Sequence, residues 1–293
     1  GGGNLGTFFQ TITNGILIGG VYAVVATGLT LIFGVLNVAN FAQGEFMMLG
    51  MYVTLFLSRG LGVDPYLLTF LVAVIFIAFG YLVEKFLIHQ TLSKPHETQM
   101  LLTLGLAIFF RSLMMVICGP NYQSLAVPYR LKSLLIGGVL LSYPRLLSFL
   151  VAVVLIILLW LFLNYTELGR AIRASSQNSK AATLMGINSN WMYGIAFSIG
   201  IMLAAVGGLT LVPFYYVFPD VGVYFGLIAF VVVVLGGLGD VLGAIVSALL
   251  IGIIESVTAQ YVALDLSHLG VFLVFILVLV FRPQGLLRGR RSS

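Results

Sequence analysis

The chain alternates between long apolar stretches and short polar segments. A helix needs about 20 mostly apolar residues to cross the hydrocarbon core of a bilayer. Nine stretches approach or reach that length, at residues 9–35, 44–58, 66–89, 99–118, 146–164, 191–213, 223–238, 243–262 and 267–282. Stretch 44–58 is short, and almost no loop separates 223–238 from 243–262, so one or two re-entrant half-helices are expected. The pattern predicts an all-α, polytopic transmembrane helical bundle with eight or nine crossings.

Composition excludes the soluble classes of protein. Hydrophobic residues make up 60% of the 293 and charged residues only 8%, against about 25% charged in an ordinary soluble domain. So few charges could not cover a soluble surface, and lipid must therefore solvate the outside. The length fits one transmembrane domain over residues 1–293 with short loops and no appended soluble module.

The positions of the basic residues indicate how the chain is oriented in the membrane. They do not indicate binding to nucleic acid, which is not an expected partner. If all nine stretches cross, lysine and arginine divide nine against four between the two sides, and Arg111 lies within a stretch. The positive-inside rule then places the C-terminus in the cytoplasm and the N-terminus outside. The richer side holds Lys85, Lys94, Arg170, Arg173, Lys180, Arg282, Arg288, Arg290 and Arg291, and the other holds Arg59, Arg130, Lys132 and Arg145.

Glycines recur at a spacing of four within the apolar stretches. Small residues at this spacing let helix backbones approach closely in lipid. The pairs can therefore mark a subunit interface or a pore lining, or they can pack helices together within the bundle, which is the interpretation we favour. They are Gly15 and Gly19, Gly222 and Gly226, and Gly239 and Gly243.

A polar interruption follows the first apolar stretch. Its side chains could form a polar wall on a translocation path, or they could satisfy the backbone groups that a broken helix leaves free. A charge at the bilayer centre costs about 3 kcal/mol on insertion scales, so each is expected to find a partner. Arg111 can pair with Glu45 or with Glu255. The candidate path residues are Asn37, Asn40, Phe41, Gln43 and Glu45.

The longest polar run of the chain covers residues 165–190. Gly169 and Gly186 bracket a stretch of helix formers, Gly186 is suited to end a helix, and Asn188 is suited to start the next one. We expect a short cytoplasmic helix parallel to the membrane, with Arg170 and Arg173 on adjoining turns. Such a helix can dock into a groove on a partner protein, or it can be a solvated basic loop beside anionic lipid headgroups.

Four blocks of this sequence together resemble the branched-chain amino acid permeases of bacterial ABC importers, the Liv-type family. In the expected order, they are Gly19-Gly20-Val21-Tyr22-Ala23-Val24 through Asn40-Phe41-Ala42-Gln43-Gly44-Glu45-Phe46, then Glu167-Leu168-Gly169-Arg170-Ala171-Ile172-Arg173-Ala174 with Met185-Gly186-Ile187-Asn188, then Val234-Leu235-Gly236-Gly237-Leu238-Gly239, and Arg282-Pro283-Gln284-Gly285-Leu286. Many relatives carry histidine where Gln43 stands, which argues against a proton-linked role there.

The resemblance implies an importer complex in the bacterial inner membrane. Its other members would be a second, related permease, two cytoplasmic ATPase subunits and an extracytoplasmic solute-binding protein, with membrane lipid around the permeases. The substrate would be a branched-chain or related amino acid, or a small amide or urea-like solute. The polar run would be the segment that couples to the ATPases, through Glu167, Leu168, Gly169, Arg170, Ala171, Arg173, Ala174 and Gly186.

The sequence itself has no G-x-x-x-x-G-K-[ST] loop to hold phosphates. ATP and magnesium are therefore expected on the partner ATPases, with no cofactor in this chain. His89, His96 and His268 lack metal-ligand spacing, and no nucleophile with a base suggests an enzyme. We predict no catalytic residue and no metal site.

A transporter driven by an ion gradient is the alternative. It would account equally well for broken helices and buried carboxylates, but it gives the basic run at 165–190 no purpose. Uptake by this chain alone, in response to a proton or sodium gradient, would distinguish the two.

Overall fold

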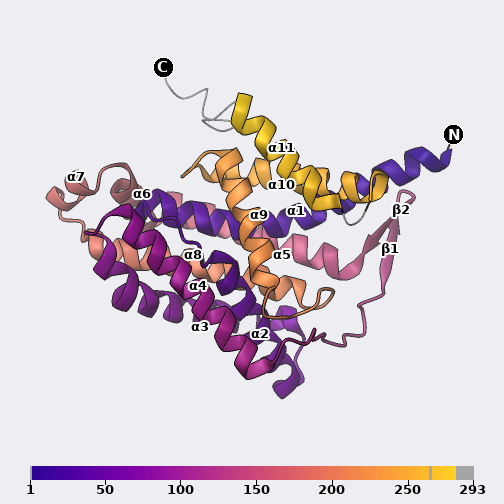
Figure 1. Ribbon diagram of the computed structural model, residues 1–293, viewed down its shortest axis with the longest axis horizontal. Coiled ribbons are helices and arrows are strands. Elements are labelled where there is room, and N and C mark those ends of the chain that lie inside the picture. The colour runs from indigo at the N-terminus through magenta and orange to yellow at the C-terminus, as the bar shows by residue number, and fades with distance from the viewer. Residues whose placement is uncertain (1, 264–265, 282–293) are drawn as a thin grey trace.

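The computed structural model describes residues 2–263 and 266–281 (Figure 1). Each of the nine predicted stretches forms a helix, which confirms the all-α polytopic bundle. The long helices are α1 (Gly2–Leu36), α4 (His96–Cys118), α5 (Tyr143–Tyr165), α8 (Ser189–Leu211) and α10 (Val241–Tyr261). A further long segment, Pro65–Thr91, joins the 3-10 turn η1 (Pro65–Leu68), α3 (Thr69–Val83), the π-helical turn η2 (Glu84–Ile88) and the 3-10 turn η3 (His89–Thr91).

Six helical segments in the described residues are long and apolar enough to cross a membrane: Gly6–Leu36, Pro65–Thr91, His96–Cys118, Tyr143–Tyr165, Ser189–Leu211 and Val241–Tyr261. The other three predicted stretches form shorter or more polar helices: α2 (Gln43–Leu61), which carries Glu45 and Arg59, α9 (Val221–Gly236) and α11 (Ser267–Phe281). Arg282, Arg288, Arg290 and Arg291, which weighed in the predicted orientation, lie outside the described residues, as does the block 282–286.

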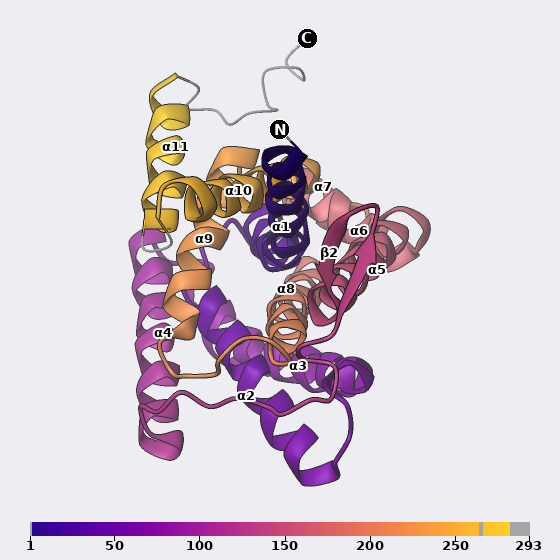
Figure 2. The same cartoon turned by 90° about the vertical axis from the view of Figure 1, so that its right-hand side faces the viewer.

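Helices α1 and α8 form the centre of the bundle. In the most apolar 18-residue stretch of each of these two helices, 83% is buried inside the bundle. In the corresponding stretches of α4 and α5, only 22% is buried. Figure 2 shows α4 and α11 along one edge and α5 at the opposite edge. The apolar side chains that α4 and α5 expose, such as Leu101, Val116 and Leu158, therefore face lipid or another membrane subunit.

The interruption after α1 leads the chain back into the bundle. Asn37 takes a left-handed conformation with φ +55°, and α2 then begins at Gln43. The Gln43 side chain reaches Val25 of α1 and Gly200 of α8. Helix α2 therefore starts beside the middle of α1 and not at its end.

Glycines set the closest helix crossings, and these lie within the chain. A Cβ on Gly44 would lie 1.8 Å from the carbonyl oxygen of Gly222, and one on Gly243 would lie 1.9 Å from that of Gly236. Gly15 is also close to a neighbouring helix, because a Cβ there would lie 2.6 Å from Ile253 Cα. The predicted glycine spacing thus serves packing inside the bundle at these crossings.

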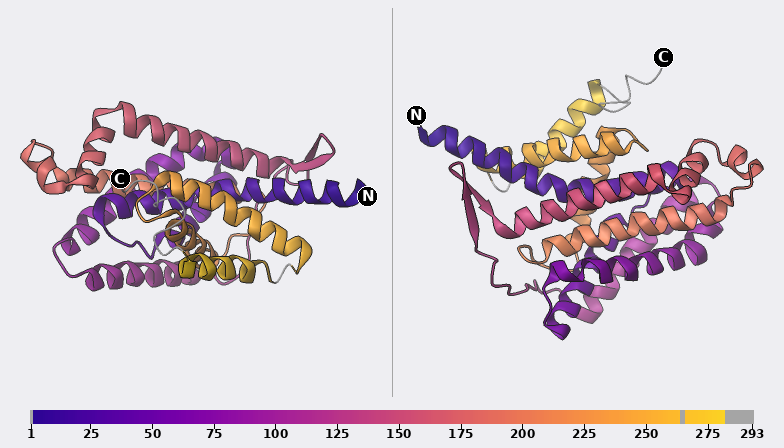
Figure 3. Two further views of the ribbon diagram at one scale, coloured as in Figure 1. Left: turned by 90° about the horizontal axis from the view of Figure 1, so that it is seen from above. Right: turned by 180° about the vertical axis from the view of Figure 1, so that it is seen from behind.

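The two ends of the bundle carry different structures (Figure 3). At one end lie the helices α6 (Glu167–Gln177) and α7 (Ser179–Leu184). At the other end, near the N-terminus, the antiparallel strands β1 (Ser133–Ile136) and β2 (Val139–Ser142) form a hairpin. The Gln10 side chain bonds the backbone of Leu140 there, and residues 123 and 217 join the two loops of this end.

Candidate functional site

The candidate coupling segment, residues 165–190, begins with a tight turn. The Thr166 hydroxyl oxygen accepts a hydrogen bond from the Gly169 amide at 3.0 Å, which caps α6. A Cβ on Gly169 would lie 2.0 Å from the carbonyl oxygen of Phe162. Only glycine therefore lets α6 fold back against the end of α5, and this buried position sets the direction in which α6 leaves the bundle.

The segment consists of two helices and not of the single helix that we predicted between Gly169 and Gly186. Gly169 lies inside α6. Asn178 interrupts the run with an extended conformation, φ −156°, and its side chain accepts a bond from the Ala181 amide to cap α7. The expected ends are confirmed: Gly186 has φ +87° after α7, and Asn188 caps α8 by accepting from the Trp191 amide at 3.2 Å.

Helix α6 presents a polar face to the outside. Ile172 and Ser175 are buried against the bundle together with Gly169, so the opposite face is free to meet a partner. Among the predicted coupling residues, Glu167, Leu168, Arg170, Arg173 and Gly186 are exposed, while Ala171 and Ala174 are half-buried. Arg173 also donates to the Asn164 side chain of α5.

Two apolar side chains at the tip of the segment escaped prediction. Leu184 is 88% exposed and Met185 is 83% exposed, where α7 projects furthest from the bundle (Figure 1). The signal was two large apolar residues beside Gly186 in an otherwise polar run. Both side chains are exposed away from the helices that cross the membrane. They therefore give the surface of the segment an apolar part.

The segment is tied firmly to α8. The Ser179 and Tyr193 hydroxyls lie 2.7 Å apart, and the Thr183 and Ser189 hydroxyls lie 2.9 Å apart. A displacement of α7 must therefore move the first turn of α8.

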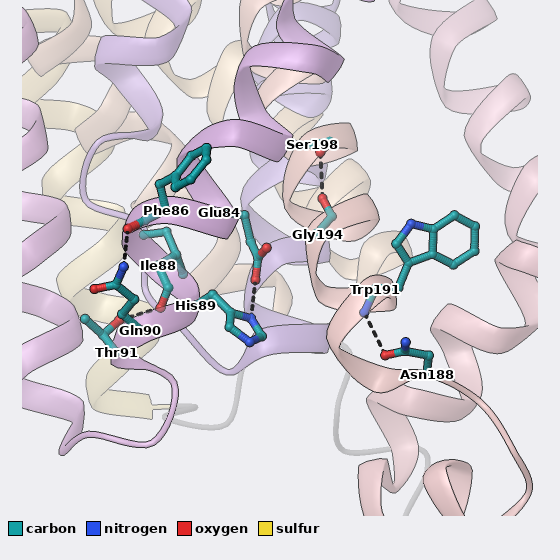
Figure 4. Close-up of polar contacts among 10 residues, drawn as sticks. All are labelled: Glu84, Phe86, Ile88, His89, Gln90, Thr91, Asn188, Trp191, Gly194 and Ser198. Carbon is teal, nitrogen blue, oxygen red and sulfur yellow. Dashed lines mark hydrogen bonds and ion pairs between the residues drawn. The ribbon is translucent and has the colours of Figure 1, made fainter.

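The start of α8 in turn meets the end of α3. Figure 4 shows Asn188 capping at Trp191, the Ser198 hydroxyl donating to the Gly194 carbonyl, and Glu84 paired with His89 at 3.1 Å. A Cβ on Gly194 would lie 2.8 Å from the Tyr81 ring, so the helices cross closely here.

A cavity of about 500 Å³ borders the inner side of α6. Trp160 of α5, Gly34 of α1 and Asp240 before α10 line it, with Ile172 and Arg173 of α6. Because α6 forms part of the wall, a shift of α6 changes the shape of this space.

The candidate path residues Asn40 and Gln43 form a buried amide network. The Asn40 side-chain nitrogen donates to Gln43 Oε1 at 3.1 Å, and its oxygen accepts from the Ala42 amide at 3.2 Å. Gln43 Nε2 donates to the carbonyls of Val25 and Gly200, both at 3.2 Å. These bonds hold the broken segment against α1 and α8, as the structural interpretation expects.

The other candidate path residues have different surroundings. Asn37 is exposed at the turn after α1, and the Phe41 ring stacks on Phe230 of α9 at 4.9 Å. Asn37, at the turn, thus lies apart from the buried network. A role on the translocation path stays a prediction for all five residues.

Arg111 pairs with Glu45 and not with Glu255. Its Nη2 lies 3.0 Å from Glu45 Oε1, and its Nε lies 3.9 Å from Asp220 Oδ1. Glu45 is almost wholly buried in the first turn of α2, where the helix dipole also favours a negative charge. The three charges connect α2, α4 and the residue before α9.

Glu255 on α10 instead accepts hydrogen bonds from two tyrosines. The Tyr22 hydroxyl lies 2.5 Å from Oε2 and the Tyr224 hydroxyl lies 2.7 Å from Oε1. Across the described residues, no group of three or more His, Cys, Asp or Glu side chains is arranged to hold a metal ion.

Comparison with known proteins gives consistent matches over nearly the whole chain. A family profile described as branched-chain amino acid transport system / permease component matches residues 11–280. The high-affinity branched-chain amino acid transport system permease protein BraD of Pseudomonas aeruginosa is 33% identical over 295 residues, which cover 96% of this chain and 95% of BraD.

Two further relatives carry similar names. The high-affinity branched-chain amino acid transport system permease protein LivH of Escherichia coli K12 is 31% identical, over 96% of this chain and 95% of its own. A probable branched-chain amino acid transport permease protein LivH of Methanocaldococcus jannaschii is 32% identical, over 85% of this chain and 80% of its own. These names describe transport permeases and not enzymes. No solved structure matches the chain significantly.

Proposed function

The chain belongs to the family of branched-chain amino acid transport permease components, and on this premise we propose that it forms a translocation path for branched-chain amino acids in an ATP-driven importer. The family membership does not favour a carrier driven by an ion gradient. The relatives named as branched-chain amino acid permeases support the substrate class.

The proposed importer contains other subunits: a second, related permease, two cytoplasmic ATPases that bind ATP and magnesium, and an extracytoplasmic solute-binding protein. This chain has no phosphate-binding G-x-x-x-x-G-K-[ST] loop, so the work of hydrolysis must reach it mechanically. In this proposal the end of the bundle with α6 and α7 faces the cytoplasm, and the hairpin end faces outside.

The observation that carries the proposal is how residues 165–190 are attached. The segment is continuous with α5 at the edge of the bundle and, through its hydroxyl contacts, with α8 at the centre. Its outer face is exposed, and its inner face borders the cavity beside Arg173. Movement of an ATPase bound to the outer face would rock α8 relative to the outer helices, which is an alternating-access motion between rigid units.

Uptake measurements test the proposal. We expect proteoliposomes that hold the complete assembly to accumulate L-leucine only with ATP inside and the solute-binding protein outside. Vesicles that hold this chain alone, under a proton or sodium gradient, should accumulate none. Gradient-driven uptake by the single chain would contradict the proposal.

A further inference from the structure

Glu255 is a carboxylate at membrane depth without a basic partner. Within the described part of the chain it forms no salt bridge, and it accepts hydrogen bonds from the hydroxyls of Tyr22 and Tyr224. A carboxylate has about four lone-pair directions, so two hydroxyl donors leave capacity for another donor. The side chain is partly exposed.

The surroundings of Glu255 keep the carboxylate oriented. The hydroxyls of Tyr22 and Tyr224 lie 3.3 Å apart, and the Tyr224 ring packs on His268 of α11 with 4.3 Å between ring centres. Burial, and then the charge of Glu255, raise the pKa of Tyr215 in the loop before α9, so that its hydroxyl stays neutral. Tyrosines from α1 and α9 thus hold one acid of α10, and α11 packs behind the Tyr224 ring.

Arg145 supplies an opposite charge close by. It lies in the first turn of α5 at the hairpin end, with its guanidinium 5.7 Å from the centre of the Phe214 ring. Phe214 is followed by Tyr215, whose ring packs on Phe225 with 5.5 Å between ring centres, and Phe225 packs in turn on Tyr22, a hydrogen-bond partner of Glu255, at 6.0 Å. Within the described residues, Arg145 and Glu255 form no salt bridge with each other. The separation contrasts with Glu45 and Arg111, which meet directly at 3.0 Å.

We propose that Glu255 and Arg145 form a binding site for a zwitterion on the translocation path, with the ammonium group at Glu255 and the carboxylate at Arg145. A charge held away from water needs a partner, and an amino acid offers both partners on one carbon atom. Tyr22 and Tyr224 act as positioning residues for the Glu255 carboxylate. The inference rests on the proposed function, since it assigns the amino acid a place within the permease.

The site lies in the half of the bundle toward the hairpin. Glu255 is three residues beyond Gly252, which packs on Gly15 and Gly19 of α1, and the next residue, Ser256, donates to the Thr11 carbonyl. In the proposed orientation this half opens to the outside. The site would therefore receive the amino acid as it leaves the solute-binding protein, before the path opens toward α6.

The test uses the complete transporter in proteoliposomes, with uptake of radiolabelled L-leucine and ATP hydrolysis measured together. We expect Glu255→Gln and Arg145→Gln each to lower leucine uptake per ATP hydrolysed about tenfold, the effect of losing one charge-assisted hydrogen bond. Hydrolysis stimulated by the loaded binding protein should stay within about twofold of wild type. The exposed Glu97→Gln and Lys132→Gln serve as matched controls and should change neither quantity.

The double variant Glu255→Gln/Arg145→Gln separates a ligand site from a structural charge pair. If both side chains bind the amino acid, the double variant is at least as defective as either single one. If they only balance each other, removal of both charges restores uptake, and this result would overturn the inference. Unchanged uptake in both single variants would overturn it while leaving the proposed function intact. A wild-type assembly that hydrolyses ATP but takes up no leucine would refute the proposed function itself, and this site with it.

Discussion

Gly44 sits where the first turns of α2 and α9 meet, and its lack of a side chain lets the two backbones touch. A Cβ there would lie 1.8 Å from the Gly222 carbonyl oxygen and 2.8 Å from Gly226 Cα. Backbone atoms cannot move aside as the end of a flexible side chain can. At the residue scale, the packing of α2 against α9 therefore depends on single glycines.

Replacement of Gly44 by alanine should force α2 and α9 apart. We expect a loss of at least about 1–3 kcal/mol, the usual cost of overpacking a filled interior, seen as a lower midpoint of thermal unfolding in detergent. Gly60→Ala is the matched control, because it lies near the end of the same helix and its Cβ would meet nothing within 4 Å. Equal midpoints for the two variants would show that this crossing is not tight.

The pair of Glu45 and Arg111 makes a second residue-scale prediction. Arg111→Met leaves the Glu45 carboxylate buried without its cation, and removal of one member of such a pair costs about 3–5 kcal/mol. We expect the lower end, since the Arg111 side chain is 32% exposed. The midpoint of thermal unfolding should fall in Arg111→Met and should recover in the double variant Glu45→Gln/Arg111→Met, which has no buried unpaired charge. No recovery would mean that Arg111 stabilises the fold through Asp220 instead.

The sequence alone could identify these charged residues, but it could not predict which of them pair with each other. Glu45, Arg111 and Glu255 are conspicuous because they interrupt apolar stretches, and each needs a partner. Which partner each finds depends on how α2, α4 and α10 pack. Glu45 and Arg111 are 66 positions apart in the sequence, and nothing in the stretch between them indicates that they meet. The two tyrosines that meet Glu255 escaped notice because an isolated tyrosine in an apolar stretch is unremarkable.

At the scale of elements, helix positions could be predicted well because lipid requires long apolar runs. The break between α6 and α7 could not. Asn178 is compatible with the interior of a helix, but its side chain caps α7 instead. Local hydrogen bonds from asparagine compete with helix continuation, and tertiary contacts such as that between Ser179 and Tyr193 decide the outcome.

The prediction at the scale of elements concerns the exposed face of α6. Arg170→Glu/Arg173→Glu should abolish ATP-dependent uptake and weaken copurification of the ATPases, because the reversed charges oppose a complementary partner surface. Membrane insertion should be unchanged, since both side chains are exposed. Lys132→Glu, directly before the hairpin at the opposite end, is the control. A double variant that still copurifies with a fully coupled ATPase would contradict the assignment of α6 as the coupling element.

On the scale of the whole molecule, the covalent route of the chain explains how a short polar segment could move a membrane bundle. The segment joins α5 at the edge directly to α8 at the centre, and α8 shares that centre with α1. The proposed zwitterion site lies on α10 and α5 in the half toward the hairpin. In this account the ATPases act on α6 and α7 at one end of the bundle, and the amino acid enters at the other end.

The central claim is that α6 and α7 receive motion from ATPase subunits, and photo-crosslinking tests it most directly. A photoreactive amino acid would replace Leu184, which is 88% exposed, or Leu131, which is 94% exposed at the hairpin end. In the assembled transporter, the account predicts that position 184 crosslinks to an ATPase subunit and that position 131 does not. A crosslink from position 184 to the solute-binding protein, or to no other subunit, would contradict it.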